Sequence, residues 1–64
     1  MSYEVGDTIT YRTLGGPLTI VVTEKEIRWD RPTFTGQCVH SVAGLYEIGQ
    51  EVWGYDSQII TVAS

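Results

Sequence analysis

The apolar residues of this chain fall into short runs that are rich in β-branched and aromatic side chains and are separated by glycine, proline and aspartate. Runs of this composition favour β-strands, and the residues between them favour turns. Apolar residues nowhere recur with the i, i+3, i+4, i+7 spacing of an amphipathic helix. The sequence therefore predicts an all-β fold with no α-helix and at most one 3₁₀ turn.

Five strands are predicted from these runs, at residues 8–14, 18–29, 34–42, 51–55 and 59–62. Turns are predicted at Gly15-Gly16-Pro17, at Asp30-Arg31-Pro32-Thr33 and at Asp56-Ser57-Gln58. The segment 43–50 is predicted to be a loop, with room for a short strand inside it, because Gly44 and Gly49 bracket its apolar residues.

The second predicted strand changes the side on which its apolar residues lie. Its first half has one apolar face, formed by Leu18, Ile20 and Val22, whereas Ile27 and Trp29 follow the opposite phase. A strand cannot change its buried face without a bulge or a bend. The sequence therefore predicts a buried first half and an irregularity in the segment 23–27. Long strands that bend and serve two sheets are typical of small barrels.

Length and charge restrict the function. A chain of 64 residues makes a single domain, and its net charge of −4 argues against binding to duplex nucleic acid, which needs a basic face. Cys38 is the only cysteine, so an intramolecular disulfide is excluded. The first residues lack a signal-peptide pattern, and no apolar run is long enough to cross a membrane. We expect a cytoplasmic protein that is not an enzyme and has no cofactor.

The opening Val5-Gly6-Asp7-Thr8-Ile9, followed by five predicted strands with a very short turn before the last, resembles SH3-like barrels, including KOW and Tudor-type modules. The resemblance implies a single five-stranded SH3-like barrel over residues 1–64. The chain lacks the Ala-Leu-Tyr-Asp-Tyr type of strand found in SH3 domains that bind proline-rich peptides. Its closing segment, 51–59, resembles small uncharacterised bacterial proteins of similar length, from which no activity carries over.

Four aromatic residues are candidates for a contact surface: Trp29, Tyr46, Trp53 and Tyr55. Trp53 and Tyr55 alternate with Val52 along the fourth predicted strand, so they share the face opposite to it. Their rings either form an exposed pair or cap the open ends of a small barrel. Tyr46 lies in the apolar loop 43–50, which is either a lid on the core or a contact surface.

Two other groups of residues are candidates for a catalytic or metal-binding site. Cys38 and His40 are predicted to share a strand face about 6.5–7 Å apart, which is wide for a nucleophile and its base, and two ligands are too few for zinc. A buried thiol and a half-exposed imidazole are therefore expected, with no catalytic or metal site. Glu24 and Glu26 are expected to protect the apolar strand before them from aggregation.

These observations favour a small non-catalytic module that binds a partner protein, or a second copy of itself, through its aromatic surface. The alternative is a barrel of the KOW or Tudor type in which the aromatic rings stack on single-stranded bases. Charge separates the two, because a basic groove requires at least three of the four cationic residues to cluster: Arg12, Lys25, Arg28 and Arg31.

Overall fold

A computed structural model describes residues 2–42 and 44–63. These residues form one antiparallel sheet of five strands: β1 (Thr8–Thr13), β2 (Gly16–Arg28), β3 (Arg31–Ser41), β4 (Glu51–Tyr55) and β5 (Ile59–Ala63). A 3₁₀ turn, η1 (Asp56–Gln58), joins β4 to β5. The described part of the chain contains no α-helix, which confirms the all-β prediction, and has no helix that could cross a membrane.

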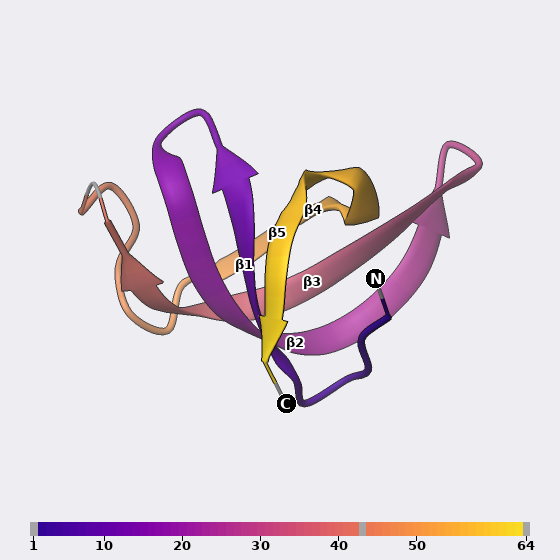
Figure 1. Ribbon diagram of the computed structural model, residues 1–64, viewed down its shortest axis with the longest axis horizontal. Coiled ribbons are helices and arrows are strands. Elements are labelled where there is room, and N and C mark those ends of the chain that lie inside the picture. The colour runs from indigo at the N-terminus through magenta and orange to yellow at the C-terminus, as the bar shows by residue number, and fades with distance from the viewer. Residues whose placement is uncertain (1, 43, 64) are drawn as a thin grey trace.

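The strand order across the sheet is β4-β3-β2-β1-β5 (Figure 1). The long β2 and β3 strands run across the molecule as a curved ribbon, and β1 and β5 lie together beside it. The predicted closure into a barrel is not observed, because β4 and β5 do not pair with each other and remain the two edges of an open sheet. The 3₁₀ turn and its side chains stand between these edges.

Two bulges interrupt the pairing of β2 with β3. Thr23 is an extra residue on β2, because Val22 pairs with Gly36 and Glu24 pairs with Thr35. This confirms the predicted irregularity. The bulge turns Ile27 to the core side of the sheet, where it pairs with Pro32, but the side chain stays 68% exposed because β2 extends beyond the core there.

The second bulge is at Val39 on β3, since Thr19 pairs with His40 but Ile20 pairs with Cys38. Cys38 therefore points into the core, whereas His40 lies on the exposed side. The prediction that Cys38 and His40 share a face is wrong, because the extra residue at Val39 reverses the alternation between them.

The core lies on the concave side of the curved sheet. Its buried apolar residues are Tyr3, Ile9, Tyr11, Leu18, Ile20, Val22, Phe34, Cys38 and Val52, which includes all three predicted for the first half of β2. Phe34 is at the centre, with edge-on contacts to Tyr11 (4.8 Å between ring centroids) and Tyr3 (6.0 Å). The Tyr3 hydroxyl donates to Asp56 Oδ1 at 2.6 Å, which fastens the N-terminal segment to η1.

The turn between β2 and β3 differs from the prediction. The chain reverses at Trp29 and Asp30, and Arg28 pairs with Arg31 across the turn. Trp29 and Asp30 both have positive φ, 51° and 59°, as a two-residue hairpin turn with the same twist as its strands requires. The predicted turn at 30–33 is wrong: Pro32 pushes the chain into an extended conformation, which here continues a strand at its first residues.

Candidate functional site

The convex side of the sheet, opposite the core, carries the candidate site. In β4, Val52 and Gly54 are buried, so the alternating Trp53 and Tyr55 point to the convex side. Trp53 pairs with Thr35 of β3, and Tyr55 pairs with Thr33. The small threonine side chains leave room for the aromatic rings above β3.

Three of the four predicted contact residues lie together on this side, and we call Trp29, Trp53 and Tyr55 the outer aromatic cluster. The ring centroids of Trp29 and Trp53 are 5.9 Å apart, and those of Trp53 and Tyr55 are 5.5 Å apart. Trp29 is 71% exposed and Trp53 is 42% exposed, while Tyr55 is half-buried. The rings therefore form a surface feature and do not cap the core.

Two arginines from the ends of β2 and β3 cover faces of these rings. The Arg28 guanidinium lies 4.6 Å from the centroid of the Trp53 ring, and that of Arg31 lies 4.0 Å from Tyr55. Arg28 Nε also donates to Glu26 Oε1 at 2.9 Å. Each exposed cation–π contact contributes about 0.5–1 kcal/mol. The arginines therefore contact the rings of Trp53 and Tyr55 without burying them fully.

The turn that presents Trp29 is strained. A turn of this kind favours Asn-Gly, because both of its central residues have positive φ. Here a bulky tryptophan and an aspartate take these places, and such conformations cost of order 1–3 kcal/mol each. Strain of this kind is common at functional sites.

Tyr46 lies apart from the outer aromatic cluster. It is half-buried and packs against the core. It also lines a groove of about 370 Å³ with the β1–β2 turn and β4. Within the loop 43–50, Ala43 lies outside the described residues. Tyr46 covers the core as a lid would, whereas Leu45 and Ile48 are 69% and 71% exposed.

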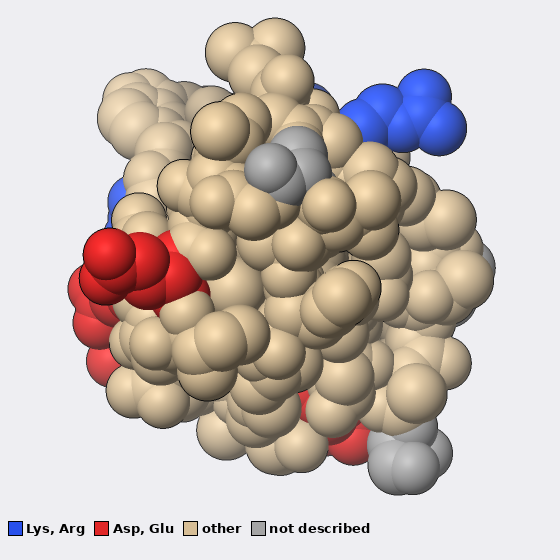
Figure 2. Space-filling view, turned by 90° about the vertical axis from the view of Figure 1, so that its left-hand side faces the viewer, with Lys and Arg blue, Asp and Glu red and all other residues tan. Residues whose placement is uncertain are grey.

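These exposed residues belong to an apolar end of the molecule formed by Leu14, Val42, Leu45 and Ile48. Figure 2 views this end, and charged side chains lie toward its rim. The Leu45 side chain lies against Gly15, so the loop and the β1–β2 turn are in contact. The sequence indicated the loop but not Leu14. The position of Leu14, directly before the two glycines of a predicted turn, could have indicated that it is exposed.

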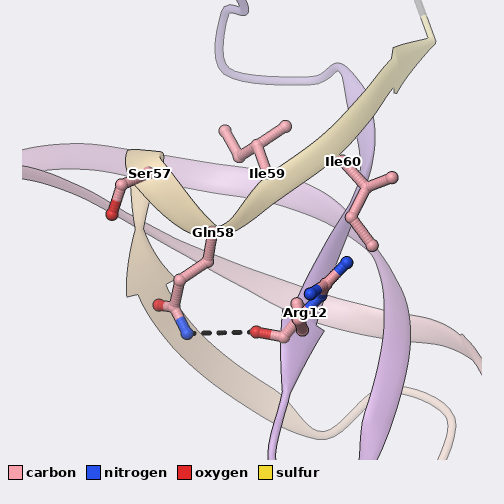
Figure 3. Close-up of a pocket in the computed structure, with 5 residues that line it drawn as sticks. All are labelled: Arg12, Ser57, Gln58, Ile59 and Ile60. Atoms are coloured by element: carbon pink, nitrogen blue, oxygen red, sulfur yellow. Dashed lines mark hydrogen bonds between the residues drawn. The ribbon is translucent and has the colours of Figure 1, made fainter.

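The four cationic residues do not form one group. Arg28 and Arg31 are neighbours on the convex side, but Lys25 lies over the Tyr3 ring on the core side. Arg12 lines a shallow pocket with η1 and β5, where its carbonyl accepts a hydrogen bond from Gln58 Nε2 at 3.0 Å (Figure 3). Lys25 therefore lies apart from the two arginines of the convex side, while Arg31 also donates at 3.2 Å to Oγ of Ser57, a residue that lines the pocket of Arg12.

Among residues 2–42 and 44–63, no group of three His, Cys, Asp or Glu side chains could hold a metal ion. Burial raises the pKa of Tyr11 to about 12, with the neighbouring Tyr46 and Cys38 adding to the effect. Burial, and then the hydrogen bond to Asp56, raises the pKa of Tyr3 as well. Both hydroxyls are therefore protonated donors at neutral pH.

Comparisons of the chain with protein-family models, with curated proteins and with solved structures found no match.

Proposed function

We propose that this chain is a small, non-catalytic, SH3-like domain that binds a cytoplasmic partner protein, or a second copy of itself, through the outer aromatic cluster. The SH3-like assignment is supported by the strand order and by the 3₁₀ turn directly before the last strand. The domain is then a partly open member of that class, with η1 filling the space between the edge strands.

The observation that carries the proposal is an exposed group of tryptophan, tyrosine and arginine side chains on one face of the sheet. Residues of these types dominate the binding energy of protein interfaces. A small domain with little stability to spare gains nothing in its own core from Trp29, which is 71% exposed and has a strained backbone. Contact with a partner would explain both the exposure of the Trp29 side chain and the strain of its backbone.

Binding to single-stranded nucleic acid remains the alternative, and the geometry supports it less. Bases stack on open ring faces, whereas arginines already cover faces of Trp53 and Tyr55. The three rings are also inclined to one another, by 38° and 68°, and do not form a continuous platform.

A capture experiment with Trp29→Asn tests the proposal. Asparagine tolerates positive φ, so this variant removes the ring while keeping the turn. Ile48→Asn is the matched control, because it removes an equally exposed apolar side chain (71% for both residues) from the other end of the molecule. The proposal predicts that the wild type and Ile48→Asn capture the same protein from the source cell and that Trp29→Asn loses it.

Equal capture by the two variants would contradict the proposed surface. Recovery of nucleic acid in place of protein, with a nuclease abolishing the signal, would favour the alternative. Melting curves of both variants establish that any loss does not come from unfolding.

A further inference from the structure

The groove beside β4 combines apolar and polar lining residues with a strand edge that no other strand of the sheet pairs with. Tyr11 and Val52 line it from the core, and Leu14 and Tyr46 line it from the β1–β2 turn and the loop. Its volume of about 370 Å³ is within the range of about 300–1,000 Å³ that is usual for ligand sites. Glu51 is the one acidic or basic residue that lines it within the described part of the chain.

The backbone of β4 alternates between facing β3 and facing this groove. The carbonyl of Gln50 accepts a hydrogen bond from the N–H of Cys38 on β3. In the antiparallel ladder the groups of Val52 and Gly54 therefore also point to β3, while those of Glu51, Trp53 and Tyr55 point away from it.

Among the described residues, side chains form hydrogen bonds with only two backbone groups of this free edge, those of Tyr55 and Trp53. Gln58 Oε1 accepts the hydrogen bond from the N–H of Tyr55 at 2.8 Å. The Tyr11 hydroxyl reaches the carbonyl of Trp53 only at 3.4 Å, which is a long contact. The N–H of Trp53 and both backbone groups of Glu51 are left facing the groove, with the spacing that an added strand would use.

We propose that this groove binds an extended segment of a partner protein, which pairs with the free edge of β4 as an additional strand. The segment carries β-branched or other apolar side chains at alternate positions, which fit the floor of the groove. It is uncharged or basic, because an acidic side chain would meet Glu51 and the chain's net charge of −4. This site uses the backbone edge of β4, whereas the proposed function uses the aromatic rings on its face, and Trp53 belongs to both.

The probe is a synthetic hexapeptide of alternating valine and threonine with one lysine, capped at both ends. The control peptide has the same side chains but is N-methylated at alternate residues, which removes the donors that would pair with β4. Hydrogen exchange of the Glu51 and Trp53 amides is followed by NMR. At about 1 mM of the first peptide we expect this exchange to slow about tenfold, as a dissociation constant of about 0.1 mM would give when only the free protein exchanges.

Two substitutions at one position test the same contact from the protein side. Glu51→Pro removes an N–H that points away from β3, and proline is tolerated on an edge strand in that orientation. Glu51→Gln removes the charge but keeps the N–H. We expect Glu51→Pro to weaken peptide binding about tenfold, for the loss of one hydrogen bond, and Glu51→Gln to stay within about twofold.

Several results would overturn the proposal. One is unchanged hydrogen exchange of the Glu51 and Trp53 amides when the peptide is added. Another is equal binding of the N-methylated peptide. Both are measured on the wild-type protein, so they do not depend on whether Glu51→Pro folds. A third is sedimentation showing that a second copy of the chain occupies this edge and excludes the peptide. Removal of the Trp29 ring by Trp29→Asn should leave peptide binding unchanged, because Trp29 does not line the groove, so a failure here is distinct from a failure of the proposed function.

Discussion

Gly36 is the residue at which a side chain conflicts most directly with this fold. A Cβ atom there would lie 2.5 Å from the carbonyl oxygen of Val21 and 2.7 Å from Cδ1 of Ile20. We expect Gly36→Ala to lower the free energy of unfolding by about 3 kcal/mol, because backbone atoms of β2 would have to move. A domain of this size has few kcal/mol to lose.

Gly6→Ala is the matched control for urea or thermal unfolding. Gly6 has φ of 96°, but a Cβ atom there would meet no other atom within 4 Å, so only conformational strain of about 1–2 kcal/mol is expected. Equal losses for the two variants would show that the close approach at Gly36 is relieved without strain.

The buried tyrosines make the stability sensitive to alkaline pH. The pKa of Tyr11 is raised from 10.0 to about 12 in the folded protein. The folded state therefore retains a proton that the unfolded state releases above pH 10, so this contribution is complete below pH 10 and is lost as the pH rises to about 12.

We expect the melting temperature to fall across this interval and to fall less steeply in Tyr11→Phe, which cannot ionise there. The hydroxyl of Tyr11 makes only a long contact to Trp53, so the variant should remain folded at neutral pH. An identical fall of the melting temperature at alkaline pH in the variant and the wild type would assign the effect to Tyr3 alone.

The turn of the β2–β3 hairpin has a strained backbone and also carries Trp29 of the candidate site. Its turn places Asp30 at a φ of 59°, where glycine is favoured. We expect Asp30→Gly to raise the free energy of unfolding by about 0.5–1 kcal/mol, because glycine removes the strain at this position. Tryptophan emission checks that the cluster is unchanged. A loss of stability in this variant would mean that the Asp30 side chain itself supports the turn.

The strands were predictable where glycine and proline bound a β-branched run. The predicted ranges of β4 and η1 match the structure, and the predicted ranges of β1 and β5 differ from it by one residue at their C-terminal ends. The parity of Ile27 revealed the bulge at Thr23, because a change of phase is visible in the sequence. The bulge at Val39 gives no such signal, since the polar His40 and Ser41 that follow it do not mark which side faces the core.

The candidate site was predictable only where the alternation of residues along a strand fixes the face on which a side chain lies. Alternation along β4 is enough to place Trp53 and Tyr55 on one face. Trp29 was brought near them correctly, but as part of a strand, because a tryptophan and an aspartate do not indicate a turn with two positive φ angles. The separation of Tyr46 depends on the fold of the loop over Gly15, which no local pattern specifies.

Two groups of exposed apolar side chains lie at opposite ends of the long β2–β3 ribbon, while others, such as Val5 and Ile60, belong to neither group. The outer aromatic cluster adjoins the β2–β3 turn, and the apolar end lies at the β1–β2 turn and the 44–50 loop (Figure 1). Exposed apolar groups on a small domain mark contact surfaces. The open sheet also leaves edges that a closed barrel would not have.

Whether the outer aromatic cluster is the contact surface is tested most directly by acrylamide quenching of tryptophan fluorescence. The chain has two tryptophans, Trp29 and Trp53, and both lie in the cluster, so all tryptophan emission reports on it. The proposal predicts that the captured partner, at saturation, shifts the emission to shorter wavelength and lowers the quenching constant several-fold. Unchanged quenching with the partner bound would contradict it.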